Sequence, residues 1–497
     1  MAADRPNILL IFTDQQRADT IGSLGNPVIR TPNLDRIRAA GTAFTSAYTP
    51  SPVCVSARCS LIYGQYPAHT ACYDNSYPMP TDGRLSFVDA LTQAGYRTHG
   101  IGKCHYTPDP HALRGFQTRE RQEEIVASPH EDDYLKFLHD AGYDRIADPH
   151  GVRGEMYYVP QPAQIPAKFH PTQWVGDRAV AFIEKAASSP QPWFLFCSFI
   201  HPHPPFCPPS PWHKLYRAPL MPMPKMPPGY ESLRTYINRR QNRYKYRDQG
   251  LDMNLLRCIK AYYYAAISFV DFQIGRVLDS IQRAGAADNT MVIFASDHGE
   301  LLGDYGCFGK RSMHDSCARV PLLISFPRRF AANALCGTPV SLVDLAPTIL
   351  AAAGASISSH ALDGADLADI AAGRSSREHV FMQYQIEGRA IYAAVGRRWK
   401  YAYSAPDGRE FLFDRVGDPE ETRDRWDTPF CREAQKEMKN VMLEHLKECG
   451  ETRALEGDDW KRFPKLEMPE NPDAMLISQD HPWACTSLPG YADGLRA

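Results

Sequence analysis

The chain has 497 residues, a length that predicts roughly two to four domains and room for a large buried core. Its content of 43% hydrophobic and 23% charged residues is ordinary for a soluble globular protein. The formal net charge of -2 gives no overall field that would attract nucleic acid or an anionic membrane, so any anion must be bound locally. The first apolar run, Ile8–Phe12, has the length of a strand, and no run approaches the roughly eighteen apolar residues of a membrane span. We therefore expect a cytoplasmic protein with no nucleic-acid or membrane partner.

Apolar segments of strand length alternate with helical segments through the first three quarters of the chain. The strand-like segments are apolar nearly throughout, which is typical of parallel strands covered on both faces. They are Ile8–Thr13, Thr98–Gly102, Trp193–Ile200, Met291–Ser296 and Leu322–Phe326. The helical segments are Leu34–Ala40, Leu85–Ala94, Leu255–Ala284 and Val343–Ala353. This alternation predicts an α/β fold with a doubly wound sheet.

The pattern changes near residue 375 and indicates a smaller C-terminal unit. Short strand-like segments are separated there by turns and are followed by a helical segment, Glu433–Glu448. The strand-like segments are Val380–Gln385, Ala390–Val395, Trp399–Tyr403 and Phe411–Asp414. We predict a main α/β domain at 1–375, an antiparallel sheet with a covering helix at 376–462, and an extended tail at 463–497. The tail lacks periodicity and is expected to wrap over the surface or over a neighbouring subunit of a homo-oligomer.

Two strand-like segments end in groups that could bind a metal. Asp14 follows the first strand, and Asp297 and His298 follow the segment that ends at Ser296. Because parallel strands place ligands at their carboxyl ends, two carboxylates and an imidazole there predict a divalent-metal site. Taken singly, each aspartate could equally be a turn former or a helix N-cap.

Cys54 is distinguished by its position among thirteen cysteines that include no C-x-x-C pair. Pro50 and Pro52 end the preceding segment, so Cys54 is expected at the N-terminus of a helix, where the potential favours a thiolate. Arg58 lies about one helical turn further on and can reach the same site. The alternative is a buried small cysteine beside a surface arginine.

The segment CVSARCSLIYG resembles the sulfatase signature C-x-P-S-R-x-x-L-x-T-G, in which the cysteine is oxidised to formylglycine. Cys54, Arg58, Leu61 and Gly64 match that signature. The chain departs from it at three positions, with Ser56 for proline, Ala57 for serine and Tyr63 for threonine. The resemblance implies that Cys54 is the substrate of a formylglycine-generating enzyme.

Further segments resemble the same family in the same order along the chain. NILLIFTDQQRAD is similar to the opening strand, and GKCHY to the motif that supplies Lys103 and His105. SFIHPHPPF is similar to the loop that supplies a histidine, here His203 rather than His201. SDHGELLGDYGCFGK is similar to the second metal motif with its downstream lysine, Lys310. The chain is thus identified as a member of the formylglycine-dependent sulfatases, which implies the alkaline-phosphatase-like fold: a large, mostly parallel sheet flanked by helices, with a smaller C-terminal α+β subdomain.

The metal motifs differ from those of lysosomal sulfatases, which have Asp-Asp and Asp-Asn-Gly at these places. Here the first motif is Asp14–Gln15 and the second is Asp297–His298. This pattern is similar to the bacterial branch that includes choline sulfatases and phosphonate monoester hydrolases. One divalent ion, calcium or manganese, is expected on Asp14, Asp297, His298 and the side chain at position 54. Gln15 is either a weak oxygen ligand or a group behind the ligands.

The family also implies roles for the remaining polar residues. The hydrated aldehyde at position 54, held by Arg58, would attack sulfur, while Lys103 and Lys310 offset charge on the ester oxygens. His203 with Lys310 would protonate the leaving group, and His105 would take a proton when sulfate is expelled. Two further residues are expected to bind the substrate, Asn75 and Thr107.

Three functions therefore remain open from the sequence. The first is hydrolysis of a sulfate monoester to an alcohol and sulfate. The second is hydrolysis of a phosphonate monoester or phosphodiester at the same centre, because both reactions are displacements at a tetrahedral oxyanion. The third is a non-catalytic binding protein in which Cys54 stays a thiol. The alcohol portion of the substrate is not predicted.

Overall fold

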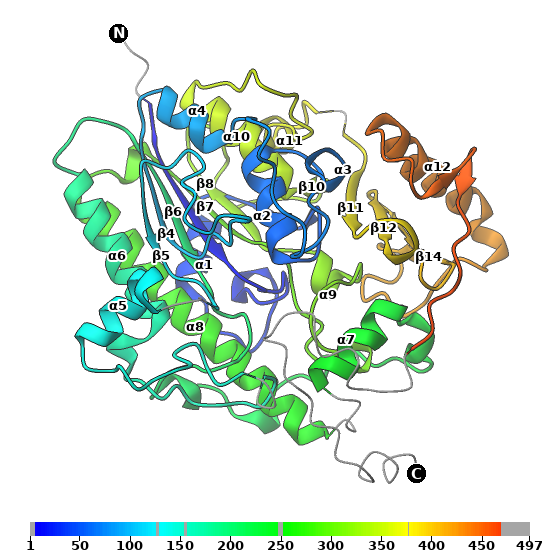
Figure 1. Ribbon diagram of the computed structural model, residues 1–497, viewed down its shortest axis with the longest axis horizontal. Coiled ribbons are helices and arrows are strands. Elements are labelled where there is room, and N and C mark those ends of the chain that lie inside the picture. Colours follow the sequence, from blue (N-terminus) through cyan, green and yellow to red (C-terminus); the bar gives the residue numbers. More distant parts are fainter. Residues whose placement is uncertain (1–4, 126–128, 154–156, 247–251, 376, 469–497) are drawn as a thin grey trace.

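The structure is a computed structural model that describes residues 5–125, 129–153, 157–246, 252–375 and 377–468. An eight-stranded sheet forms its centre, in the order β5-β4-β6-β1-β7-β8-β2-β9 (Figure 1). The strands are β5 (Thr118–Arg121), β4 (Arg97–Gly102), β6 (Trp193–Phe199), β1 (Asn7–Thr13), β7 (Thr290–Ser296), β8 (Leu322–Ser325), β2 (Thr42–Phe44) and β9 (Ala334–Cys336). The predicted α/β fold with a mostly parallel sheet is confirmed.

Strand β8 is the exception to the parallel arrangement, so our expectation of a parallel strand there was wrong. It pairs antiparallel with both β7 and β2. The chain leaves β7 through a loop that contains two short helices, the 3-10 helix Asp304–Gly306 and α9 (Asp315–Ala318), and it then re-enters the sheet at the same end. An antiparallel neighbour needs no helical crossover. The apolar composition of β8 suits burial in either direction.

Helices cover both faces of the sheet, and the alternation of side chains along β1 explains why. Ile8 and Leu10 point into the core on one face, whereas Leu9 and Ile11 point into the core on the other. The first face is covered by α2 (Cys54–Tyr63), α4 (Phe87–Gln93), α10 (Leu345–Ala353) and α11 (Leu367–Ala371). The second face is covered by α1 (Pro32–Ala39), α5 (Asp133–Asp140), α6 (Pro171–Ala186) and α8 (Met253–Arg283).

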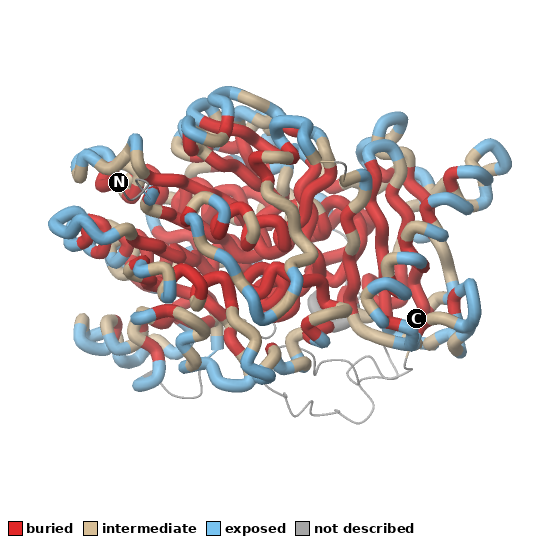
Figure 2. The backbone as a smooth tube through the Cα atoms, turned by 90° about the horizontal axis from the view of Figure 1, so that it is seen from above, coloured by how far each residue is buried: buried red, intermediate tan, exposed pale blue. Residues whose placement is uncertain are grey.

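A second, four-stranded antiparallel sheet follows in the chain. It consists of β11 (Val380–Tyr384), β12 (Ile391–Val395), β13 (Trp399–Ser404) and β14 (Arg409–Asp414). Helix α12 (Arg432–Glu448) packs on one face through Met438 and Met442. The other face packs against Tyr48, Leu301 and Tyr305 of the preceding part of the chain. Both faces are therefore buried, as the red tube of these strands shows in Figure 2.

The described chain contains four further strands and two further α-helices. They are the paired strands β3 (Ala47–Tyr48) and β10 (Val340–Ser341), the pair β15 (Leu455–Glu456) and β16 (Asp459–Trp460), and the helices α3 (Pro67–Thr70) and α7 (Tyr236–Tyr246). Among the described residues, none of the helices combines the length and apolar character that a membrane crossing requires. The domain boundaries after residues 375 and 462 stay predictions, and most of the predicted tail, 469–497, lies outside the described residues.

Candidate active site

The candidate site lies at the carboxyl ends of the central parallel strands. β1 and β7 are neighbours in register, with Thr13 opposite Ser296, so Asp14 and Asp297 emerge side by side. The N-terminus of α2 brings Cys54 to the same place. We call Asp14, Cys54, Asp297 and His298 the reaction centre.

The four side chains of the reaction centre converge closely enough to share one cation. One ligand atom from each lies within 4.8 Å of those of the other three, and all four residues are buried. Cys54 Sγ lies 3.8 Å from Asp14 Oδ1 and 3.3 Å from His298 Nε2. The predicted metal-ligating residues are thus brought together by the fold.

Arg58 donates hydrogen bonds to the carboxylates of both Asp14 and Asp297. Its Nε donates to Asp297 Oδ2 at 3.0 Å, and its Nη2 donates to Asp14 Oδ2 at 3.2 Å. Its Nη1 donates to the carbonyl oxygen of Lys103 at 2.6 Å and to Ser198 Oγ at 3.1 Å. With a buried guanidinium bound by four oxygens, Arg58 fixes the carboxylates relative to the α2 N-terminus.

The predicted lysines and histidines surround Cys54. Lys310 Nζ donates to Cys54 Sγ at 2.7 Å and lies 3.2 Å from His203 Nε2. Lys103 Nζ donates to Asp14 Oδ2. The side chain of His105 is a further group that lowers the pKa of Cys54. Two cations and two imidazoles therefore face the position of the nucleophile.

These cations set the charge state of the centre. Burial alone would raise the pKa of the Cys54 thiol, but Lys103, Lys310 and His298 together hold it well below its usual value. Burial likewise opposes ionisation of Asp14, yet Lys103 and Lys310, with His203, hold the pKa of Asp14 far below its usual range. Cys54 and Asp14, which could both ligate a metal, are therefore negatively charged near neutral pH.

The residues fit a divalent cation on two further observations. A carbonyl oxygen can only accept a hydrogen bond, so the 3.0 Å contact with Gly299 O places a proton on His298 Nδ1 and leaves Nε2 free as a ligand. Gln15 donates from Nε2 to Glu300 and from its backbone nitrogen to Asp297 Oδ1. Its Oε1 is buried and has no hydrogen-bond partner among the described residues, as expected of an oxygen that completes a cation's coordination.

Local backbone geometry places Lys103 and Gln15. Gly102 has a φ of 86°, and a Cβ there would collide with the carbonyl oxygen of Ser198, so only glycine allows the turn that presents Lys103. Gln15 and His105 also lie in the left-handed region, with φ of 65° and 55°. Non-glycine residues in this region are strained and concentrate at functional sites.

The two predicted substrate-binding residues are placed differently by the structure. Asn75 Oδ1 accepts from the backbone nitrogen of Val55 at 3.0 Å, which satisfies a free donor in the first turn of α2. Thr107 Oγ1 accepts from the backbone nitrogen of Met79 at 3.1 Å, and the described contacts do not link it to Cys54. Asn75 therefore supports the nucleophile's helix, while a substrate role for either residue stays a prediction.

His201 and His203 are separated by the fold as the motif implied. His203 faces Lys310, whereas His201 joins His170 and Cys207 in a second buried group, which we call the His/Cys cluster. In that cluster His201 Nδ1 lies 3.1 Å from Thr172 Oγ1. Of the two histidines, the one singled out from sequence is the one at the reaction centre.

Glu124 was missed by the sequence analysis. Its carboxylate forms ion pairs with Lys103 and with Arg153, the latter at 3.0 Å, and Oε2 lies 3.3 Å from His203 Nε2. One of its oxygens lies within 4.8 Å of ligand atoms of Asp14 and Cys54. Two successive glutamates after an edge strand look like a solvated surface in the sequence, so no signal marked this residue.

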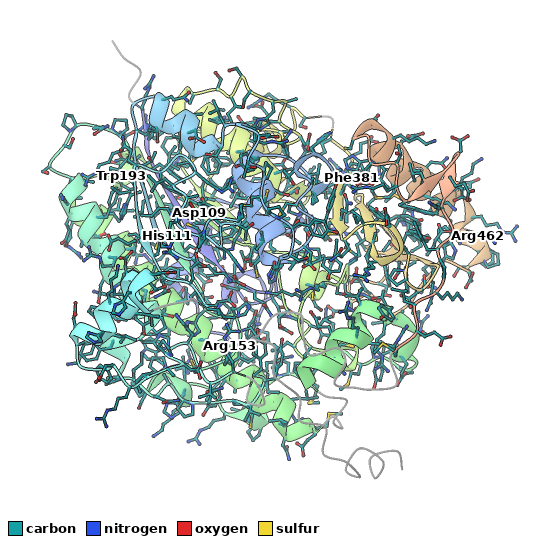
Figure 3. All side chains as sticks on the ribbon, in the orientation of Figure 1. Asp109, His111, Arg153, Trp193, Phe381 and Arg462 are labelled. Carbon is teal, nitrogen blue, oxygen red and sulfur yellow. The ribbon has the colours of Figure 1, made fainter. Side chains whose placement is uncertain are left out.

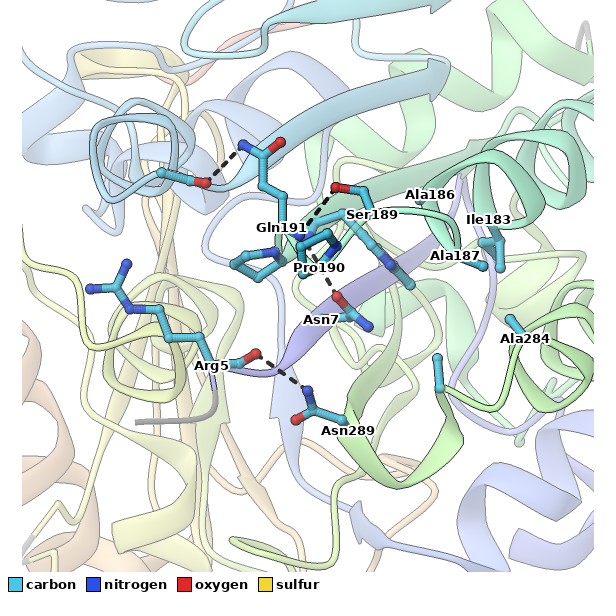
Figure 4. A pocket seen from close by; sticks show the side chains of 14 residues that line it. Arg5, Asn7, Ile183, Ala186, Ala187, Ser189, Pro190, Gln191, Ala284 and Asn289 are labelled. Carbon is cyan, nitrogen blue, oxygen red and sulfur yellow. Dashed lines mark hydrogen bonds between the residues drawn. The ribbon is translucent and has the colours of Figure 1, made fainter. Parts of the chain in front are cut away.

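A pocket of about 610 Å³ lies at the opposite ends of the same strands. Figure 4 shows Arg5, Asn7 and Asn289 around it, at the amino ends of β1 and β7. Ligands of parallel α/β sheets bind at the carboxyl ends, and this pocket contains none of the groups of the reaction centre. This pocket is therefore separate from the candidate active site.

Comparison with known proteins agrees with the geometry. Residues 6–355, more than half of the chain, match the family model "Sulfatase". Residues 303–448 match the model "N-sulphoglucosamine sulphohydrolase, C-terminal". The second match spans the end of the large sheet and the antiparallel sheet.

Individual relatives cover most of the chain. An arylsulfatase of Clostridium perfringens is 29% identical over 89% of this chain and 94% of its own length. A choline-sulfatase of Rhizobium meliloti is 29% identical, over 86% and 84% respectively. The crystal structure of a phosphonate monoester hydrolase of Agrobacterium radiobacter superposes with a TM-score of 0.79 at 24% identity, covering 90% of this chain and 96% of that one, which shows a shared fold. The chain therefore belongs to the sulfatase family of sulfuric ester hydrolases, within the alkaline phosphatase superfamily.

Proposed function

We propose that the protein hydrolyses sulfate monoesters to an alcohol and inorganic sulfate, with residue 54 as the nucleophile after oxidation of Cys54 to formylglycine. The single observation that carries this proposal is the contact of Lys310 with Cys54 inside a set of four metal-type donors. Family membership and the relatives named arylsulfatase and choline-sulfatase support the sulfate ester as substrate.

A divalent cation, when bound, would supply positive charge that offsets the ester's oxygens and makes the nucleophile more acidic. Asp14, Asp297, His298 and the side chain at position 54 would hold it, with Gln15 Oε1 as a further oxygen. Two carboxylates and an amide oxygen suit calcium, while the imidazole also suits manganese.

Charged side chains of the chain itself would bind the sulfuryl group. Lys310 contacts Cys54, Lys103 contacts the neighbouring Asp14, and both lysines are buried. They can therefore neutralise the non-bridging and leaving oxygens with little competition from water. Arg58 donates to both Asp14 and Asp297 and holds the two carboxylates in place. This arrangement stabilises negative charge before the substrate arrives, and it therefore needs little rearrangement during reaction.

Two histidines could move protons. His203 Nδ1 donates to the carbonyl oxygen of Pro204 at 2.6 Å, which directs Nε2 toward Lys310 and the substrate position. Because Nδ1 carries the ring proton, Nε2 accepts from Lys310 Nζ, and the proton of the Lys310 ammonium would pass through Nε2 to the leaving oxygen. His105, whose side chain also acts on Cys54, would accept the proton released when sulfate leaves.

Maturation must precede folding in this proposal. Cys54 and Ser56 are both fully buried, and Ser56 Oγ donates to the carbonyl oxygen of Cys72. A formylglycine-generating enzyme would need this segment extended, before α2 forms against the sheet. The serine in place of the signature proline would then act at the recognition step and not in the folded site.

The proposal is tested by comparing kcat/KM for 4-nitrophenyl sulfate with that for a phenyl phosphonate monoester on the mature protein with metal. We expect the sulfate ester to be preferred. A preference of several orders of magnitude for the phosphonate would instead assign the centre to phosphonate monoester or phosphodiester hydrolysis. Activity toward neither ester, together with unmodified Cys54, would indicate a binding protein.

A further inference from the structure

A carboxylate lies where an anionic substrate must approach. The side chain of Glu124 is only 10% exposed, and Arg153, its partner at 3.0 Å, is 14% exposed (Arg153 is labelled in Figure 3). Glu124 also pairs with Lys103 and lies 3.3 Å from His203 Nε2. Both of these residues have a role in the proposed reaction, so Glu124 is adjacent to the reacting atoms.

Charge decides which part of the substrate Glu124 can face. The sulfuryl group is anionic and is bound by Lys103 and Lys310. A carboxylate placed against the oxygens of the sulfuryl group would be strongly repelled by them. His203, by contrast, faces the leaving oxygen. Glu124 beside His203 therefore lies next to the first atoms of the alcohol portion.

The pair Glu124–Arg153 offers both kinds of hydrogen-bonding group side by side. The carboxylate accepts, and the guanidinium donates in a fixed plane. A hydroxyl group both donates and accepts, so neighbouring hydroxyls on one molecule can bind to both members of the pair. A quaternary ammonium would be repelled by Arg153, a second anionic group would be repelled by Glu124, and an aryl ring would offer a hydrogen bond to neither.

We propose that Glu124 and Arg153 form the subsite for the alcohol portion and select sulfate esters of polyhydroxylated alcohols, the chemistry of saccharide sulfates. This inference rests on the proposed function. Tyr157 forms one wall of the subsite, with its ring 5.5 Å from the Arg153 guanidinium and edge-on to His203 at 6.4 Å between centroids. Lys103 is released from Glu124 when the sulfuryl group binds, and the carboxylate then accepts from the hydroxyl next to the ester.

The test compares substrates in wild type and Glu124→Gln, which keeps the shape of the side chain and removes its charge. The substrates are monosaccharide sulfates with a free hydroxyl next to the ester, 4-nitrophenyl sulfate and choline sulfate. In wild type, kcat/KM is highest for a saccharide sulfate. In the variant, the ratio of kcat/KM for that saccharide sulfate to kcat/KM for 4-nitrophenyl sulfate falls by about tenfold or more, because a site built to bind a hydroxyl loses its acceptor.

Glu120→Gln is the matched control. Glu120 lies four residues earlier on β5 and pairs with His99 and Arg178, away from the centre, so its substitution leaves the substrate ratio unchanged. A wild-type preference for choline sulfate or 4-nitrophenyl sulfate overturns the inference. An equal loss for every substrate in Glu124→Gln also overturns it, because the residue would then act on the sulfuryl group alone.

Binding of the free sugar separates this inference from the proposed function. Saturation-transfer NMR of the desulfated monosaccharide should show contact with wild type and loss of contact in Glu124→Gln. If wild type hydrolyses no sulfate ester while this difference persists, the proposed function fails and the subsite stands. If sulfate esters are hydrolysed while the sugar signal is the same in both proteins, the subsite fails.

Discussion

The reaction centre and the His/Cys cluster are two buried groups of metal-type donors on either side of the segment 201–203, in which His201 belongs to the cluster and His203 faces Lys310 beside the reaction centre. In each group the donor atoms lie within 4.8 Å of one another. In the His/Cys cluster the contacts are neutral: His170 Nε2 donates to the carbonyl oxygen of Cys207 at 3.1 Å, and Cys207 Sγ donates to that of His150 at 3.0 Å. Burial lowers the pKa of His201 to about 4 and raises that of Cys207 to about 12, so both side chains are uncharged near neutral pH.

The reaction centre differs in its neighbours and not in its donor types. Lys103 and Lys310 hold Cys54 and Asp14 in their charged forms despite complete burial. Among the described residues around the cysteine of the His/Cys cluster, Arg153 lowers the pKa of Cys207, but burial outweighs this effect. Compensated buried charge, more than the proximity of cysteine and histidine, therefore distinguishes a catalytic centre from a hydrogen-bonded structural cluster.

The largest expected difference is between the two cysteines. Cys54→Ala should lower kcat by at least about 10⁴-fold because it removes the nucleophile, while Cys207→Ala should change kcat by less than about threefold. Thermal unfolding of both variants checks that each remains folded. Loss of the fold in Cys54→Ala, with no separate effect on turnover, would make Cys54 a structural residue.

The next largest difference is expected between His203 and His201, in the effect of their substitution on kcat/KM. His203→Gln should lower kcat/KM for an alkyl sulfate by about 10³-fold and that for 4-nitrophenyl sulfate much less, because a good leaving group needs little protonation. His201→Gln, the matched control, should not alter the ratio between these substrates. Equal losses for both substrates in His203→Gln would remove its role as proton donor.

Metal binding is expected to depend on the reaction centre and not on the His/Cys cluster. Asp297→Asn should weaken the binding of calcium or manganese by at least about 100-fold, since it removes a charged ligand that also binds Arg58. Equilibrium dialysis followed by elemental analysis measures this. His201→Gln should retain the wild-type stoichiometry, and metal loss in that variant instead would move the site to the His/Cys cluster.

The remaining expected effect is on stability in acid. The folded pKa of His201, about 4, lies below the ordinary value of 6.5, so the unfolded chain binds more protons between these pH values. The stability that depends on neutral His201 is therefore present above about pH 6.5 and is lost as the pH falls toward 4. Denaturant unfolding should show that the difference between wild type and His201→Gln shrinks on acidification, by on the order of 3 kcal/mol. A difference independent of pH would contradict the neutral cluster.

Much of the fold and centre could be predicted from local pattern. The apolar segments that became β1 and β7 end at Asp14 and Asp297, and parallel pairing of these strands was enough to bring both carboxylates together. Cys54 at the start of α2 followed from the prolines before it. These features depend on short-range signals and on the rule that ligands gather at the carboxyl ends of strands.

Long-range features could not be predicted in the same way. The direction of β8 depends on the loop that connects it to β7. Its apolar residues would be buried equally well in a parallel or an antiparallel strand. Glu124 reaches Lys103 because β5 pairs with β4 in a register that sets Arg121 opposite Gly102. That register, and with it the position of Glu124, is a property of the sheet that the sequence around residue 124 does not express.

The state of residue 54 tests the central claim most directly. Peptide mass spectrometry on protein from its native host should find the peptide that contains position 54 lighter than the cysteine form, because formylglycine replaces sulfur with oxygen. The modified fraction should rise and fall with the kcat of the preparation on sulfate esters. Unmodified Cys54 in a preparation that hydrolyses sulfate esters at full rate would contradict the account.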